Sequence, residues 1–369
     1  MILRFYPTKD ATIYERYPNK NTGLDAVLDI SKVLNGSTPY NSRVLIDFDW
    51  KAVDLAIADW GLTDANSTNW KLKMYVTDEQ EIPLDYQINC YGLSKPWSMG
   101  VGRYGNVPET TEGVSWNYRV GKLDQATSWL TGSYPAGTTG SYQTNSGGGE
   151  WNISPEATQT FNYKAGDLSM DVSSVVRPIL GISQPSSSSM YGFLLKKTDT
   201  DESSTSTFRS IKFFSRDTHT VFAPVLELGY DDSIQSSSLP NINTEEAFNV
   251  VAVNMRMDYK ESSVQKVRFA ARPAYPTATF VTASGYLERY LLPEGSQYAV
   301  YSAQSDDVII DYSDYTKLSS DDNGNYFRIS FENFQPERYY RFVIRVKNDG
   351  EAGYQVHDNN WIFKVSRNQ

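Results

Sequence analysis

The stretch Asn41-Ser42-Arg43-Val44-Leu45-Ile46-Asp47-Phe48-Asp49 decides the fold class of this chain. Alternate side chains of an extended segment point to opposite faces, so Val44, Ile46 and Phe48, followed by Trp50, share one face. The opposite face carries Arg43, Leu45, Asp47 and Asp49. An apolar face of this kind is typical of a strand that packs against a second sheet. The stretch therefore predicts a β-sandwich with Val44, Ile46, Phe48 and Trp50 in its core.

Strands with the same period of two occur throughout the first 230 residues. Trp70, Leu72, Met74 and Val76 form one apolar face, Tyr191, Phe193 and Leu195 a second, and Leu226, Leu228 and Tyr230 a third. Together they predict a two-layer antiparallel sandwich. Upstream of the opening stretch, Asn19 to Gly23 predicts a turn-rich loop in which Gly23 can take a positive φ at no steric cost.

Two segments in this region have helical spacing. Val172, Val175, Val176, Ile179 and Leu180 follow Asp171, a residue that caps helices well. Pro178 limits this helix to one or two turns. Residues 51–59 form a weaker helix candidate.

The remainder of the chain predicts a second all-β module. Residues 231–245 are polar and contain Pro240, which predicts a linker between residues 1–230 and residues 246–369. Beyond it the period of two returns in four segments, around Phe269, Ile329, Ile344 and Phe363. About 125 residues of this pattern predict an immunoglobulin-like β-sandwich. The fold class is thus all-β, with a jelly-roll-like sandwich followed by a smaller immunoglobulin-like one.

Composition restricts the classes of partner and of chemistry. The 369 residues carry a formal net charge of -10, which disfavours a nucleic-acid partner because phosphate binding needs clustered Lys and Arg. Cys90 is the only cysteine, so no intramolecular disulfide can form, and we expect it to be a small buried hydrophobic residue. No segment approaches the length of a membrane span, and the start of the sequence has no signal-peptide pattern. We expect no membrane partner.

Several short motifs, taken in order, carry a family resemblance. They are Lys9-Asp10-Ala11-Thr12-Ile13-Tyr14, Asn19 to Gly23, the opening stretch, Lys95-Pro96-Trp97, Val114-Ser115-Trp116-Asn117, Asp171-Val172, and Phe214-Ser215-Arg216-Asp217 with Pro224 to Leu228. This order resembles the DNRLRE domain family and the related disaggregatase-type carbohydrate-binding modules over about the first 230 residues. The resemblance implies a sandwich fold and, in some related domains, polysaccharide binding. It assigns no sugar-contacting residue in this sequence.

Aromatic residues in the irregular region between Gly100 and Thr160 are the candidates for sugar contact. Trp97 and Trp116 coincide with motif positions, so we expect them in the core. Tyr104, Trp129 and Trp151 are free of that constraint and are the glycan-contact candidates, because sugars stack on exposed aromatic rings.

Arg341 and Arg345 share one face of a predicted strand with Val343 between them. A solvated sheet face explains them, and a contact face for an acidic partner is the alternative. This stretch and the two-sandwich layout resemble structural proteins of large tailed bacteriophages.

No residue pattern predicts catalysis, a cofactor or a metal. His219 is expected to be an exposed loop residue, and Asp199-Thr200-Asp201-Glu202 a solvated acidic loop. Asp321-Asp322-Asn323-Gly324-Asn325 is too short for a calcium loop, so it predicts a hairpin turn with Asn323 and Gly324 at its centre. A structural calcium remains an open alternative.

These observations lead to one functional hypothesis and one alternative. The first is a non-enzymatic structural component of a tailed-phage virion, in the neck, tail, fibre or head decoration. Such a component would be made in the host cytoplasm, would form a homo-oligomer and would contact other virion proteins. The alternative is an adhesion module that binds a host surface polysaccharide.

Overall fold

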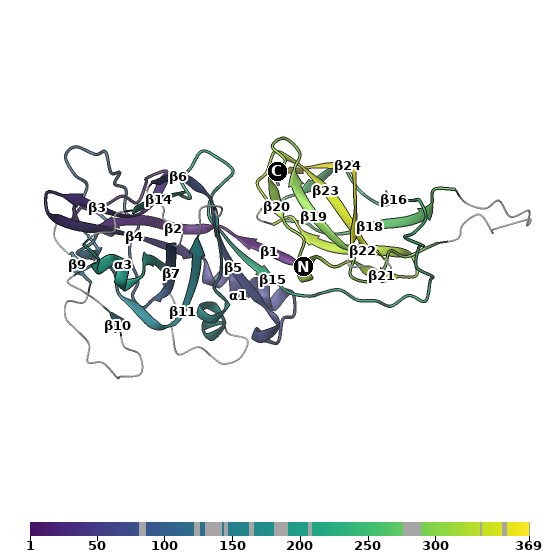
Figure 1. The fold of residues 1–369 in the computed structure, drawn as a ribbon, viewed down its shortest axis with the longest axis horizontal. Helices are drawn as coiled ribbons and strands as arrows, with labels where there is room; N and C mark the ends of the chain where they lie inside the picture. Colours follow the sequence, from purple (N-terminus) through teal and green to yellow (C-terminus); the bar gives the residue numbers. More distant parts are fainter. Residues whose placement is uncertain are drawn as a thin grey trace, which may run out of the picture. The chain divides into compact units, whose positions relative to one another are not determined.

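The computed structural model describes residues 1–80, 86–121, 126–129, 142–143, 147–161, 166–180, 191–205, 209–275, 289–332, 334–348 and 353–368. The chain divides into two compact units, one of Phe5–Glu227 and one of Met1–Arg4 with Leu228–Gln369. β-sheet is the main regular structure of each unit (Figure 1), which confirms the predicted all-β fold class.

Within the described residues, the strands up to Gly229 form two main sheets. One has the order β1-β15-β5-β12, and the division between the units falls within β1 and β15. The other, nine-stranded, has the order β10-β11-β7-β13-β4-β3-β14-β6, with β2 paired to β4. β8 and β9 pair separately. The strands are β1 (Ile2–Phe5), β2 (Pro7–Tyr14), β3 (Val27–Asn35), β4 (Thr38–Phe48), β5 (Asn69–Met74), β6 (Val76–Gln80), β7 (Tyr86–Leu93), β8 (Tyr118–Val120), β9 (Thr127–Ser128), β10 (Tyr142–Gln143), β11 (Trp151–Phe161), β12 (Leu168–Asp171), β13 (Phe193–Lys197), β14 (Arg209–Phe214) and β15 (Val225–Gly229).

Strand β4 contains the opening stretch, and its residues Ser42 to Phe48 are all buried. Val44, Ile46 and Phe48 lie in the core as predicted. Trp50 instead begins helix α1 (Trp50–Asp59), because the Asp49 side chain accepts hydrogen bonds from the backbone N–H groups of Lys51 and Ala52. This N-cap ends the strand at Phe48, two residues before Trp50, where the predicted alternation ends.

The second face of β4 is also buried. Leu45 belongs to a hydrophobic cluster with Trp97, Trp116, Trp129 and Trp151. Trp97, Trp116 and Trp129 follow β7 in the sequence, and Trp151 begins β11, so apolar side chains cover this face of the sheet. Trp97 and Trp116 are core residues, as predicted.

The predicted strand from Trp70 to Val76 is two strands. β5 ends at Met74 and β6 begins at Val76, and they belong to different sheets. Trp70, Leu72 and Met74 are buried as the alternation requires. The chain crosses between the layers at Tyr75, a change that a continuous period of two does not signal.

The short helix predicted after Asp171 is present. The Asp171 carboxylate accepts a hydrogen bond from the Ser173 N–H at 2.9 Å, and α2 (Ser173–Val176) begins there. The 3₁₀ helix η2 (Arg177–Ile179) continues it, with Pro178 near its start, so the helical segment remains short as predicted. The remaining helices are η1 (Ala65–Ser67), α3 (Asp199–Ser203) and η3 (Asp314–Thr316).

The second unit is an immunoglobulin-like sandwich, as predicted. One sheet has the order β16-β18-β22-β21 and the other β17-β24-β23-β19-β20, with β17 parallel to β24. These orders match the A-B-E-D and G-F-C arrangements of that fold. The strands are β16 (Phe248–Ala252), β17 (Asp258–Lys260), β18 (Val264–Pro273), β19 (Gln297–Ser302), β20 (Val308–Ile310), β21 (Ser319–Asp321), β22 (Gly324–Ser330), β23 (Arg338–Lys347) and β24 (Tyr354–Ser366).

Two local features of this unit differ from expectation. Residues 231–245, predicted as a linker, contact the sandwich through bridges from Gln235 to Ser320 and from Asn241 to Leu291. The β21–β22 hairpin pairs Asp321 with Gly324, so Asp322 and Asn323 are its central residues. The predicted turn is therefore present but displaced by one residue, because Gly324 with φ +112° is the first residue of the returning strand.

Candidate functional site

A groove of about 510 Å³ lies on the unit Phe5–Glu227 and combines aromatic with polar side chains. Four tyrosines line it, Tyr14, Tyr17, Tyr40 and Tyr104. Its charged lining residues are Arg16, Asp25, Asp29 and Lys212. Tyrosine presents an apolar ring and a polar tip, so such a lining suits a ligand that has both apolar faces and hydroxyl groups.

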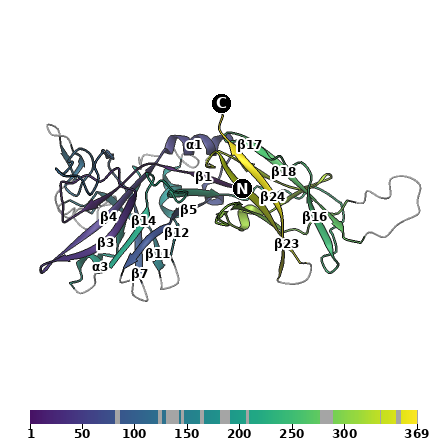
Figure 2. The same ribbon diagram turned by 90° about the horizontal axis from the view of Figure 1, so that it is seen from above.

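Strand β3 supplies the floor of the groove. Val27, Asp29, Ser31 and Val33 alternate along β3 and all line the groove, as expected for one face of a strand. Strands β4 and β14 lie on either side of β3 (Figure 2), and β14 places Lys212 directly opposite Asp29.

Asp29 is the carboxylate held most firmly on this floor. Its Oδ2 accepts a hydrogen bond from the Ser31 hydroxyl at 3.0 Å, and its Oδ1 accepts one from the Ser210 hydroxyl at 3.2 Å. Burial raises the pKa of Asp29, while these two hydroxyls oppose the rise. Two weak donors orient the carboxylate without neutralising its charge.

The tyrosines form a packed wall. The ring of Tyr104 lies 5.1 Å from that of Tyr14 and 5.7 Å from that of Tyr17, centroid to centroid. The Lys20 ammonium lies 4.5 Å from the Tyr17 ring and 4.8 Å from the Tyr104 ring. It also donates a hydrogen bond to the Tyr104 carbonyl at 3.1 Å. These contacts fix the rings, while 44% of Tyr104 remains exposed.

Asn21 anchors the loop that carries Tyr104. Its Nδ2 donates to the carbonyls of Met99, at 2.7 Å, and Val114, at 2.8 Å, and its Oδ1 accepts from the Gly102 N–H at 2.7 Å. Asn21 is fully buried, so these bonds satisfy its amide in place of water. The loop from Met99 to Val114 is therefore held at both ends by one side chain.

Gly23 has a different role from the one predicted. It does not have the positive φ that a glycine allows. Instead, a Cβ at this position would lie 2.2 Å from the Met99 carbonyl oxygen. Gly23 allows the backbone of this loop to approach closely.

Asp25 completes the placement of Tyr104. Its carboxylate accepts the Tyr104 N–H at 3.1 and 3.2 Å, one distance for each oxygen. Burial raises the pKa of Asp25, and this backbone hydrogen bond opposes the rise.

The three glycan-contact candidates lie in different environments in the structure. Tyr104 lies in the groove, but Trp129 and Trp151 are 1% and 2% exposed, so neither can present a ring to a sugar. The Trp129 indole N–H donates to the Ser115 carbonyl at 3.0 Å. Those two assignments are wrong, because both indoles pack on the second face of β4, which needs an apolar cover.

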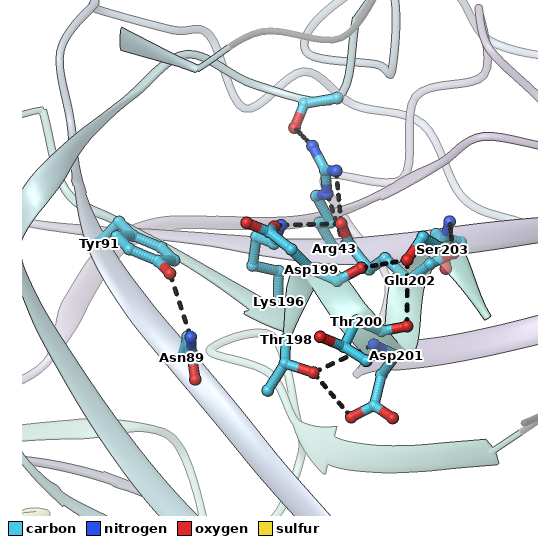
Figure 3. A network of polar contacts seen from close by, with 12 residues as sticks. Arg43, Asn89, Tyr91, Lys196, Thr198, Asp199, Thr200, Asp201, Glu202 and Ser203 are labelled. Atoms are coloured by element: carbon cyan, nitrogen blue, oxygen red, sulfur yellow. Dashed lines mark hydrogen bonds and ion pairs between the residues drawn. The ribbon is translucent and has the colours of Figure 1, made fainter. Parts of the chain in front are cut away.

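A buried ion network, drawn in Figure 3, involves Arg43, Lys196 and Glu202. Arg43 and Lys196 both lie over the Trp151 ring. The Glu202 carboxylate accepts hydrogen bonds from Arg43 Nε at 2.9 Å and Nη2 at 2.7 Å, and it pairs with Lys196 Nζ at 2.8 Å. The guanidinium of Arg43 also lies 4.9 Å from the Trp116 ring. Burial acts to raise the pKa of Glu202, but Arg43 and Lys196 outweigh it and hold that pKa below its ordinary value.

The segment Asp199 to Glu202 is therefore not the solvated loop that we predicted. It forms the helix α3, capped by the Thr198 hydroxyl, which accepts the Asp201 N–H at 3.1 Å. Glu202 points inward because Arg43 and Lys196 are buried and need a counter-charge. The network stabilises the sheet and lies outside the groove lining.

The partner-contact candidates lie on β23 of the immunoglobulin-like unit. Arg341 pairs with Asp306 at 2.5 Å and with Asp358 at 3.1 Å, so acidic groups of its own unit already surround it. The Arg345 guanidinium lies 4.4 Å from the Tyr312 ring and 4.3 Å from the Tyr354 ring. Its Nε donates to the Gln297 side-chain oxygen at 2.6 Å.

The structure also places the residues that were considered for metal binding and for nucleophilic chemistry. Among the described residues, no group of three or more His, Cys, Asp and Glu could hold a metal ion. His219 is exposed, as predicted, and Cys90 is fully buried, which raises the pKa of its thiol. In the described part of the chain, no helix is long and apolar enough to cross a membrane.

Sequence reasoning found Tyr104 but missed Tyr14, Tyr17 and Tyr40. A sequence signal was present, because Tyr14 ends the Lys9 to Tyr14 motif, Tyr17 lies two residues before Asn19, and Tyr40 immediately precedes the opening stretch. Neither a scan against models of known protein families nor a search of curated proteins found a match to this chain.

Proposed function

We propose that the unit Phe5–Glu227 is a carbohydrate-binding module that holds a saccharide in the tyrosine-lined groove and performs no catalysis. The observation that carries this proposal is the combination of fixed tyrosine rings with two carboxylates of the same groove, Asp25 and Asp29. Pyranose rings have apolar C–H faces that pack on aromatic rings, and their hydroxyls donate to carboxylates.

Preorganisation supports binding at this groove. Lys20, Asn21 and Asp25 fix the position of Tyr104, so a ligand does not need to order that loop. Affinity increases when a site loses little conformational freedom on binding. The loop that carries Tyr104 is therefore preorganised for binding.

A glycan array probed with the full chain tests the proposal. We expect binding to at least one saccharide, and Tyr104→Ala should weaken it by at least about tenfold, roughly 1.4 kcal/mol. Tyr275→Ala is the matched control, since Tyr275 is 88% exposed and belongs to the other unit. Absence of binding by folded protein, or equal binding by Tyr104→Ala, would refute the groove as a saccharide site.

We also propose that the chain acts within a larger assembly, as a component of a tailed-phage virion. The supporting observation is a strip of exposed apolar side chains on β24 of the immunoglobulin-like unit, Tyr354, Val356 and Ile362. Arg345 pairs in register with Val356 and stacks on Tyr354, which adds an aromatic and cationic element suited to protein contacts. Mass spectrometry of purified particles should detect the chain, and its absence from particles would refute this role.

A further inference from the structure

We infer that the groove selects saccharides without acidic groups, so that its ligand is a neutral or amino-sugar chain and not a uronic-acid polymer. This inference rests on the carbohydrate-binding function proposed above. It follows from the arrangement of acidic and basic side chains in and around the groove.

The two carboxylates of the groove have no cation among their direct hydrogen-bond partners in the described residues. Asp29 is bonded to the hydroxyls of Ser31 and Ser210, and Asp25 to the backbone N–H of Tyr104. Lys212 and Lys197 act on Asp29 from nearby, and Arg103 and Lys20 act on Asp25, each opposing the rise that burial causes in the pKa of that carboxyl. An acidic sugar at the same place would still bring a third negative charge next to two carboxylates that are already partly desolvated. Like charges at short range in a partly dry site repel strongly.

Two lysines at or near the groove are paired with acidic residues. Lys212 Nζ lies 2.9 Å from an Asp78 oxygen, and Lys20 Nζ lies 3.2 Å from an oxygen of Glu109. Lys20 also stacks against Tyr17 and Tyr104, so its ammonium supports the tyrosine wall. A ligand carboxylate would have to compete with Asp78 or Glu109 for these cations.

Arg16 is the cation that could favour an acidic ligand. Its guanidinium lies 5.3 Å from the Tyr17 ring, and the residue is exposed. Exposed charges are screened by water and salt, whereas Asp29 lies on the floor of the groove. The repulsion from Asp25 and Asp29 should therefore outweigh the attraction of Arg16.

The test compares three classes of hexasaccharide by isothermal titration with the full chain. The probes are neutral cellohexaose and N-acetylchitohexaose, cationic chitosan hexamer, and anionic hexamers of galacturonate and of alginate. We expect a neutral or cationic hexamer to bind at least tenfold more tightly than either anionic one. Higher salt should narrow this difference, since it screens the repulsion.

Two variants test the cause of the selectivity. Asp25→Asn and Asp29→Asn should each reduce the preference against galacturonate severalfold. Should Asp29→Asn fail to fold, the salt dependence of the unmodified chain still decides the matter.

The outcomes separate the two proposals. Tighter or equal binding of an anionic hexamer would overturn the selectivity while the carbohydrate-binding function stands. No binding of any hexamer, together with a negative glycan array, would overturn the function itself.

Discussion

Glu202 is a single buried carboxylate on which two buried cations depend. Arg43 and Lys196 both pair with it, and neither is more than 5% exposed at its side chain. Replacing it by the isosteric amide in Glu202→Gln removes the carboxylate partner of Arg43 and leaves Lys196 with the exposed Asp199. Removing one partner of a buried ion pair typically costs about 3 kcal/mol or more. We expect the unfolding free energy of this unit to fall by that amount in urea titrations.

Tryptophan fluorescence is a suitable probe for this experiment, because seven of the eight tryptophans lie within Phe5–Glu227. Asp199→Asn is the matched control on the same helix. Asp199 also pairs with Lys196, but its side chain is 69% exposed, so its loss should cost about 0.5 kcal/mol. Equal effects of the two substitutions would contradict the importance that we give to burial.

At the scale of the element, the loop from Met99 to Val114 depends on close backbone contact with Gly23. In Gly23→Ala the new Cβ would overlap the Met99 carbonyl, and neither backbone segment can move without breaking the bonds of Asn21. We expect a loss of about 1–3 kcal/mol in the unfolding free energy. Hydrogen exchange should accelerate across the loop, and saccharide binding should weaken because Tyr104 moves.

Gly105→Ala is the control within the same loop. No heavy atom lies within 4 Å of a Cβ placed there, and its φ is outside the left-handed region. It should therefore leave hydrogen exchange and binding unchanged. Acceleration of exchange in both variants to the same degree would show that the loop is loosely held, contrary to the role of Asn21.

The period of two in the sequence predicted the strands well, but it did not predict which side chains pack against them. The alternation at Val44 to Phe48 and at Phe342 to Val346 identified buried strands, because burial on one face leaves a local pattern. It could not show that the second face of β4 is covered by Trp129 and Trp151, which lie more than 80 residues away in sequence. Glu202 was misjudged for the same reason, since its partners Arg43 and Lys196 are defined only by the tertiary fold.

The groove was predictable in part. Tyr104 was found because it lies in an irregular region rich in aromatic residues. Tyr14 and Tyr17 come from the end of β2 and the turn after it, and Tyr40 comes from β4. Only the pairing of β2, β3 and β4 brings these two segments together. Charge selectivity was beyond the sequence, because it depends on which lysines have acidic partners.

At the scale of the whole molecule, the formal net charge of -10 counts every lysine as protonated. One buried lysine, Lys197, changes its protonation state near neutral pH. Burial lowers the pKa of Lys197 to about 7, while Asp29 opposes the shift and Arg209 adds to it. The ammonium is 2.7 Å from the Arg209 carbonyl, its hydrogen-bond acceptor. The nearby charged groups are Asp29, Arg209, Asp201 and Lys32.

The sign of the effect on stability follows from proton binding. Between about pH 7 and pH 10 the folded chain holds Lys197 neutral, while the unfolded chain keeps it protonated. The unfolded state therefore binds more protons, and stability rises with pH, by up to about 1.4 kcal/mol per pH unit from this group. Below pH 7 both states are protonated, so this contribution no longer changes.

Lys197→Met isolates this contribution. The unfolding free energy of the original chain, minus that of the variant, should rise from pH 7 to pH 10 when both are measured in urea at each pH. Taking the difference cancels the titration of groups that the two proteins share. Lys51→Met, at an exposed position on α1, should give a flat difference over the same range. A difference that stays flat for Lys197→Met would mean that the folded protein keeps this lysine charged, because only a neutral amine in the folded state makes stability depend on pH in this window.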